Sequence, residues 1–140
     1  ADVKSTTILD YGDTLRAVVS ANHCHRGGLI HQESYLRVEG EKGIVHLTLG
    51  LCLDYPRGQP DRLEVCLFED GQEPAWQTVP VEGTWFPHAF IGTMASVMRK
   101  VEDPTRELPT SMDDAVRTMA LVEAAYTSSA SGATPIPYEE

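Results

Sequence analysis

The chain has 140 residues, 41% of them hydrophobic and 23% charged, as expected for one globular domain. Asp and Glu outnumber Lys and Arg by 21 to 11, giving a formal charge of −10 with no basic cluster, which argues against nucleic-acid binding. No apolar run approaches the roughly 20 residues that span a membrane, and no signal peptide opens the chain. We therefore expect a cytoplasmic protein without membrane contact.

Turn residues divide the first part of the chain into about seven short strands. Tyr11-Gly12-Asp13 and Asp70-Gly71 are turn signals between segments rich in β-branched residues, so both predict β-hairpins. The predicted strands are 5–10, 14–21, 33–39, 44–53 with a break at Gly50, 62–68 and 75–81. Alternation in 14–21 places Leu15, Ala17, Val19 and Ala21 on one face, and in 44–53 Val45, Leu47 and Leu49 on one face.

Two helices follow the strands. The first, 86–101, has Pro87 in its first turn and an apolar stripe, and Gly92 within it suggests close packing. The second, within 110–132, has Ser111 as N-cap and Gly132 as C-terminal stop. Its predicted core face comprises Met112, Ala115, Val116, Met119, Val122 and Tyr126. A short final strand is expected at 134–138.

Strands before helices predict an α+β fold for 1–140, a single domain: a mostly antiparallel open sheet with both helices packed on one face. Residue 1 leads almost directly into a strand, which suggests a segment of a longer protein. The three cysteines lack a CxxC spacing, so no disulfide framework is expected. Cys52 and Cys66 lie in apolar runs and are expected to be buried thiols.

The densest group of potential ligands is His23-Cys24-His25, with His31 six residues later. Imidazole and thiolate bind zinc and related metals, but the usual zinc spacings are absent. Contact with a substrate from a loop beside a cleft is a second interpretation. Solvated loop residues without a ligand are the third, and the default.

Other candidate groups favour structural roles. Glu123 falls on the predicted apolar face of the second helix, where a carboxylate needs a hydrogen-bond partner. Lys42 lies in a hairpin turn and is expected to be exposed. GxSxG, GxGxxG and GxxxxGK[ST] do not occur, so neither a nucleophile elbow nor a phosphate-binding loop is predicted.

The order of several motifs resembles the Gfo/Idh/MocA family, the glucose–fructose oxidoreductase and inositol dehydrogenase group. These motifs are PHAFIGTMASVMRKV at 87–101, SMDDAVRTMALVEAAYTSSASG at 111–132, ATPIPY at 133–138, and the hairpin LRVEGEKGIVHL at 36–47. The hairpin around Tyr11-Gly12-Asp13 adds to the resemblance, which covers nearly the whole chain. Within this pattern Glu123 belongs to a VEA helix segment, which implies that it anchors the helix to the sheet.

The resemblance implies most of the second domain of such an oxidoreductase, which shapes the substrate site and builds the oligomer. Family members bind NAD(P) in an N-terminal Rossmann domain, whose fingerprint is absent from these 140 residues. The Glu-Lys-Pro segment with its catalytic lysine is absent too, since Glu41-Lys42-Gly43 lies in a hairpin turn. No catalytic, cofactor-binding or metal-binding residue is therefore assigned to the chain.

The leading hypothesis is a C-terminal domain from an NAD- or NADP-dependent oxidoreductase acting on a sugar, polyol or related hydroxyl-bearing substrate. His23, His25 and Arg26 are the expected substrate-side contacts. The expected partners are the Rossmann domain and further copies of the chain, bound through the sheet face opposite the helices. Alternatives are a free-standing binding or dimerisation module without catalysis, and a small metalloprotein using the histidine cluster.

Overall fold

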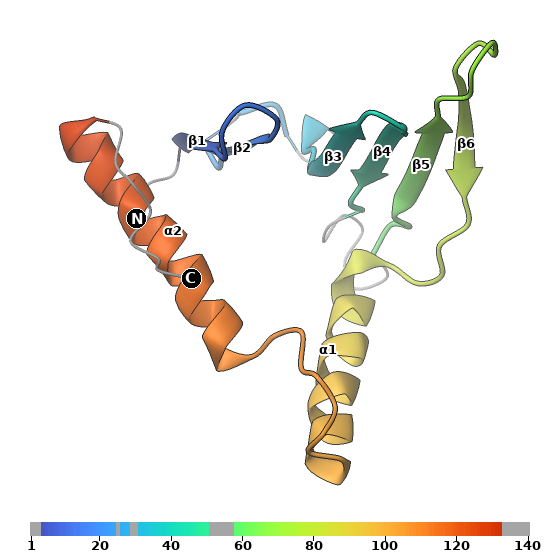
Figure 1. The fold of residues 1–140 in the computed structure, drawn as a ribbon. Helices are drawn as coiled ribbons and strands as arrows, with labels where there is room; N and C mark the ends of the chain where they lie inside the picture. The colour runs from blue at the N-terminus through green and yellow to red at the C-terminus, as the bar shows by residue number, and fades with distance from the viewer. Residues whose placement is uncertain (1–3, 25, 29–30, 51–57, 133–140) are drawn as a thin grey trace. The chain divides into compact units, whose positions relative to one another are not determined.

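The computed structural model describes residues 4–24, 26–28, 31–50 and 58–132, without the side chains of residues 85–87. The chain divides into two compact units, one formed by 1–26 with 107–140 and the other by 27–106. Within the described residues, six antiparallel strands precede two helices, which confirms the α+β class (Figure 1). The strands form a two-stranded and a four-stranded sheet, where the sequence predicted one sheet.

The first unit begins with the predicted hairpin, in which β1 (Lys4–Asp10) pairs with β2 (Arg16–Asn22). The Tyr11 amide donates to the Leu15 carbonyl at 3.0 Å, and the Gly12 amide to the Asp10 carboxylate at 3.1 Å. Gly12 has φ +94°, a conformation that glycine adopts without strain. The half-buried side chains of the hairpin all lie on one face: Thr7, Leu9, Ala17 and Ala21.

The second helix of the chain, α2 (Met112–Ser131), belongs to this unit and ends where the sequence predicted. The Ser111 hydroxyl accepts a hydrogen bond from the Asp114 amide at 3.2 Å, and Asp113 and Asp114 place negative charge in the first turn. Both features stabilise a helix N-terminus. Gly132, with φ +92°, ends the helix, and its amide donates to the Ser128 carbonyl at 2.8 Å.

The covered side of α2 is not the predicted one. The large apolar side chains that the sequence assigned to the core are exposed, Met112 at 80% and Val116 at 62%. Buried or half-buried positions lie on the opposite side of the helix: Ala120, Leu121, Ala124, Ala125 and Ser128. Most of these side chains are small.

The second unit contains a sheet with strand order β3-β4-β5-β6, each strand antiparallel to its neighbours (Figure 1). The strands are β3 (Tyr35–Gly40), β4 (Gly43–Thr48), β5 (Arg62–Leu67) and β6 (Ala75–Val79). Glu41 and Lys42 form the turn between β3 and β4, and Gly71, with φ +79°, lies in the predicted turn between β5 and β6. Sequence and structure agree on all four strands, although each is shorter than its predicted range.

The predicted interruption at Gly50 is present, because β4 ends at Thr48. Gly50 is buried, and its amide donates to the Asp61 carboxylate at 2.8 Å. A β-carbon at this position would collide with the Gln59 carbonyl and lie 3.1 Å from the Pro60 carbonyl oxygen. The chain thus passes so close to itself before β5 that only glycine fits at residue 50.

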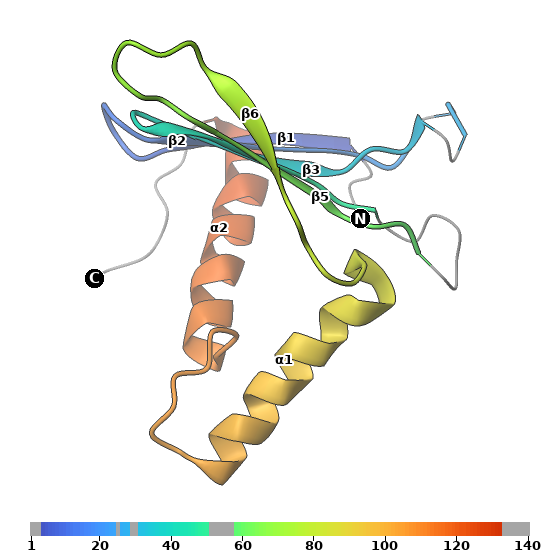
Figure 2. The same ribbon diagram turned by 90° about the vertical axis from the view of Figure 1, so that its right-hand side faces the viewer.

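Helix α1 (Trp85–Glu102) follows β6 and extends beyond the sheet of its own unit (Figure 2). Its predicted stripe is exposed, with Ile91 at 65% and Val101 at 77%. A β-carbon on Gly92 would meet nothing within 4 Å, so the close packing expected there is absent.

The loop after α1 begins with a hydrogen-bonded turn at Asp103. The Thr105 hydroxyl and the Thr105 amide both donate to the Asp103 carboxylate. These bonds, together with one from Arg106, hold the pKa of the Asp103 carboxyl below its ordinary 3.8.

Two predictions fall outside the described residues, the final strand at 134–138 and the burial of Cys52. Cys24 and Cys66 are both free thiols, and Cys66 is 1% exposed, as expected from its apolar run. No helix in the described ranges has the length and apolar character needed to cross a membrane.

Candidate functional site

The register of β3–β6 sorts the side chains of this sheet into two faces of opposite character. Residues that pair directly across antiparallel strands lie on the same face. Leu36, Leu47, Leu63 and Val79 form one such row across the sheet, and Val38, Val45, Val65 and Gln77 form the next. With Leu67 and Ala75, these residues define the apolar face.

The opposite side, the polar face, also consists of rows. Arg37, His46, Glu64 and Thr78 form the central row. Tyr35, Thr48 and Arg62 form the row on one side of it, and Glu39, Ile44, Cys66 and Trp76 the row on the other. Two of these rows carry arginine and all three carry hydrogen-bonding side chains, so this face can bind charged or polar partners.

Contacts between neighbouring side chains order the polar face. Arg37 Nε lies 2.5 Å from Glu39 Oε1, and Arg62 Nη2 donates to Glu64 Oε1 at 2.6 Å. The rings of Tyr35 and His46 stack with centroids 5.4 Å apart and planes inclined by 15°. These ion pairs are largely exposed and contribute little to stability by themselves.

The polar face also contains a deeply buried thiol, that of Cys66. Cys66 pairs directly with Ile44 on β4 and with Trp76 on β6, and it is the most deeply buried apolar side chain among the described residues. Trp76 remains 49% exposed beside it. Cys66 therefore has a packing role and is not accessible as a nucleophile.

The apolar face is open to solvent over much of its area. Leu36 is 59% exposed and Leu67 58%, while Leu63 and Val65 in the middle of the sheet are half-buried. Exposed apolar patches of this kind mark surfaces that bind protein. This sheet thus has two accessible faces, one suited to hydrophobic contact and the other to charge pairing.

The predicted histidine cluster is only partly described. His23, Cys24 and Arg26 are exposed after β2, and the Cys24 amide donates to the Asn22 side chain at 3.1 Å. His25 lies outside the described residues. His31 is exposed too, in the second unit, and the described residues contain no group of three side chains that could together bind a metal ion.

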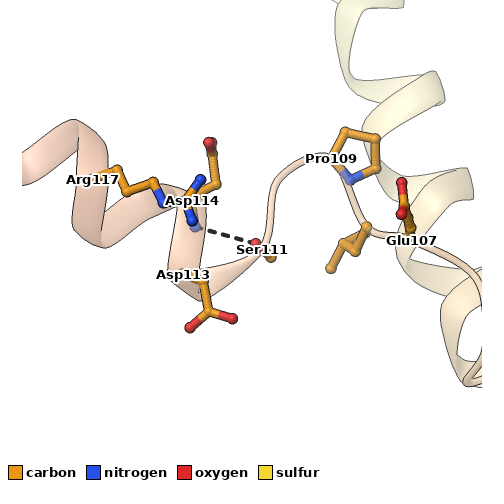
Figure 3. A pocket seen from close by; sticks show the side chains of 7 residues that line it. Glu107, Pro109, Ser111, Asp113, Asp114 and Arg117 are labelled. Atoms are coloured by element: carbon orange, nitrogen blue, oxygen red, sulfur yellow. Dashed lines mark hydrogen bonds between the residues drawn. The ribbon is translucent and has the colours of Figure 1, made fainter. Parts of the chain in front are cut away.

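A hollow of about 540 Å³ lies at the start of α2 (Figure 3). Its lining residues are Glu107, Leu108, Pro109, Ser111, Asp113, Asp114 and Arg117. Ser111 and Asp114 are joined by the hydrogen bond that caps the helix, so both residues have a structural role. The sequence had not singled out this hollow, since Glu107, Leu108 and Pro109 come from an irregular loop before the helix.

Glu123 and Lys42 are both exposed. The Lys42 side chain therefore lies in the turn as expected, and its carbonyl accepts from the Phe68 amide at 3.0 Å. For Glu123 the sequence predicted a carboxylate that anchors the helix to the sheet, and its exposure contradicts this. The backbone carbonyl of Glu123 accepts a hydrogen bond from the Thr127 hydroxyl at 3.0 Å.

A scan against protein-family models and searches of curated proteins and of solved structures all find no match to this chain.

The sequence contained the signal for the two-faced sheet, but only in part. Alternation in β4 separates Val45 and Leu47 from His46, as predicted. The rows become visible only once the turn at Glu41 and Lys42 fixes which residues of β3 and β4 stand opposite each other. The stacking of Tyr35 on His46 depends on that register, so the sequence alone did not single out either ring.

Proposed function

We propose that this chain is the substrate-shaping and subunit-association domain of an NAD(P)-dependent oxidoreductase. The whole enzyme would transfer a hydride between nicotinamide and a sugar, polyol or related hydroxyl-bearing substrate in the cytosol. The family resemblance supports the enzymatic part. The association part rests on one observation, the open four-stranded sheet with an apolar and a polar face.

Exposed apolar side chains give association its driving force. Covering a Leu or Val side chain fully is worth about 1.5–3 kcal/mol relative to leaving it in water. The apolar face and the stripe on α1 both contain such side chains, for example Leu36 and Ile91. Further polypeptide that covers them stabilises the fold, so the domain is suited to function within a larger assembly.

The nicotinamide cofactor would bind elsewhere in the same enzyme, on a Rossmann domain. The chain contains no glycine-rich phosphate-binding motif, and the proposal assigns it no catalytic residue. His23, His25 and Arg26 are proposed as contacts to the substrate. His23 and Arg26 are exposed, and imidazole and guanidinium groups donate hydrogen bonds to hydroxyl oxygens.

Isothermal titration calorimetry with NADH and NADPH tests whether the cofactor site lies outside this chain. We expect neither nucleotide to bind this chain at millimolar concentration, because a dinucleotide needs backbone amides at a helix N-terminus behind a glycine-rich turn. A defined one-to-one titration with either nucleotide would show that the chain has a cofactor site of its own and contradict this assignment.

The second candidate is a binding or dimerisation module without catalysis, favoured by the same open sheet. The gene sequence upstream of Ala1 discriminates between the two. The oxidoreductase proposal expects a strand–turn–helix with GxGxxG, followed by a Glu-Lys-Pro segment. An upstream region encoding an unrelated domain, or a start codon next to residue 1, would favour the module.

A further inference from the structure

We propose that Met94 and Met98 on α1 form a redox-sensitive modification site, where a peroxide converts both thioethers to sulfoxides and thereby weakens association through the apolar stripe of this helix. The inference rests on the proposed association function and adds a means of controlling it. It is carried by the placement of the methionines, because all four in the chain are exposed and lie on the apolar sides of the two helices.

Exposure of every methionine in a chain is unusual, because methionine is among the residues most often fully buried. Met94 is 59% exposed and Met98 is 62% exposed. Met112 and Met119 on α2 are exposed as well. Because the susceptibility of a thioether to oxidation follows its exposure, a peroxide can reach these side chains without any opening of the fold.

Met94 and Met98 lie one helical turn apart on α1, about 6 Å from each other along the helix axis, and therefore share one stripe. Away from this stripe, the Lys100 amine donates to the Pro104 and Arg106 carbonyls at 2.5 and 2.6 Å. A partner that covers α1 by hydrophobic contact must therefore cover both methionines. The stripe consists of exposed apolar side chains: Phe90, Ile91, Met94, Val97, Met98 and Val101.

The proposed modification is a two-electron oxidation of each thioether by hydrogen peroxide. The sulfur lone pair attacks one peroxide oxygen, and the O–O bond breaks as the S–O bond forms. The departing hydroxide takes the proton of the new S–OH group and leaves as water. The sulfur is oxidised and the peroxide reduced, so no further reactant is needed. Methionine sulfoxide reductases reverse the change, as regulation requires.

Oxidation makes the middle of the stripe polar. Each sulfoxide oxygen accepts hydrogen bonds from water, and a partner that covers the stripe has to remove that water. We expect the dissociation constant to rise at least about tenfold, because two side chains no longer contribute hydrophobic stabilisation to the contact. The fold itself should persist, since the new oxygen atoms belong to exposed side chains. Weaker association in an intact fold distinguishes a switch from oxidative damage to a core.

The methionines of α2 provide the matched control. Met112 is the first residue of its helix, and Met119 lies two turns further on. Two turns correspond to about 10 Å, so a contact on this helix can cover one methionine and leave the other in water. We therefore expect a peroxide to modify all four residues and association to respond to the pair on α1.

The test combines peptide mass mapping, sedimentation equilibrium and circular dichroism on the chain before and after treatment with hydrogen peroxide. Every sample contains Cys24→Ser, because Cys24 is an exposed thiol. Catalase and then dithiothreitol end the treatment, which restores other oxidised thiols and leaves the sulfoxides. Peroxide should raise the dissociation constant at least about tenfold without changing the circular dichroism spectrum. Methionine sulfoxide reductases should return it to the starting value.

Three double variants locate the effect. M94L/M98L keeps the size and hydrophobicity of the stripe, so it should associate like the parent chain and resist peroxide. M112L/M119L should remain as sensitive as the parent chain. M94Q/M98Q, which has polar side chains of similar length, should associate at least about tenfold more weakly without any peroxide.

The outcomes separate this inference from the association function. Full oxidation of Met94 and Met98 without weaker association would overturn the inference and leave the association function intact. Oxidation of these two residues more than about tenfold more slowly than free methionine would do the same, as would protection by M112L/M119L equal to that by M94L/M98L. A parent chain that is already monomeric at millimolar concentration before treatment would overturn both.

Discussion

Replacing Gly43 by alanine is expected to destabilise the four-stranded sheet by at least about 2 kcal/mol. Gly43 opens β4 with φ +153°, a conformation that L residues rarely adopt. Its β-carbon would collide with the Cys66 carbonyl and lie 3.2 Å from the Leu67 Cα, both backbone groups of β5. The backbone strain at residue 43 and the collision of the added methyl group both affect the pairing of β4 with β5. The methyl group can therefore be accommodated only if these two strands separate.

Gly40→Ala is the matched control for this change, since Gly40 pairs with Gly43 across the same turn. A β-carbon on Gly40 meets nothing within 4 Å, so a change within about 0.5 kcal/mol is expected. Urea unfolding gives the free energies, and amide exchange in β4 and β5 shows whether the loss is local. Equal effects of the two substitutions would contradict the close approach at Gly43.

Gly50→Ala is expected to cost about 2–3 kcal/mol and to weaken the start of β5. The added methyl group would collide with the Gln59 carbonyl. Relief of that collision moves the Gly50 amide away from the Asp61 carboxylate, which it contacts at 2.8 Å in a partly buried position. A buried donor that loses its acceptor adds its own desolvation penalty.

Gly92→Ala provides a control of opposite sign. This glycine lies within α1, and a β-carbon on it would meet nothing within 4 Å. Alanine at an exposed helix position should stabilise by about 1 kcal/mol. The midpoint temperature of thermal unfolding should therefore fall for Gly50→Ala and rise for Gly92→Ala. A stabilising effect at residue 50 would show that the chain there has more room than the structure assigns.

Local chemistry made much of the fold predictable. Gly12 and Gly71 marked hairpin turns because few other residues adopt their backbone angles, and Ser111 marked the start of α2 because its hydroxyl satisfies a first-turn amide. These signals act within a few residues of the chain. They fixed the order of strands and helices and the two ends of α2, and β4 stopped at the predicted break.

The covered side of α2 was not predictable in this way. The helix has a side of large apolar residues, including Met112 and Met119, and an opposite side of small ones around Ala124. Hydrophobic periodicity favours the large side, whereas the structure buries Ala124 at 7% exposure. Which side is covered depends on the shape of distant segments, and periodicity contains no information about those.

The candidate site was predicted even less well. Of the three proposed substrate contacts, His23 and Arg26 are exposed as a loop contact should be, and no structural observation assigns them a ligand. The polar face was missed because Arg37, His46 and Glu64 are far apart in sequence and form a row only through strand pairing. Such rows require long-range register, and local motifs do not determine it.

Chemical cross-linking at neighbouring residues of β4 tests most directly whether a second copy binds the sheet through its apolar face. Val45 lies in the middle row of that face, and His46, the adjacent residue, lies on the polar face. Facing sheets lie about 10 Å apart, too far for a direct disulfide, so a short bis-maleimide of matching reach is the reagent. Cys24 is exposed and is replaced by serine in both variants.

Our account predicts that C24S/V45C becomes a covalent dimer, because Val45 lies in the middle row of the face whose exposed apolar side chains drive association. C24S/H46C should remain largely monomeric under the same conditions. The opposite ranking, with more dimer from His46→Cys than from Val45→Cys, would show that the polar face binds the second copy and would contradict the account.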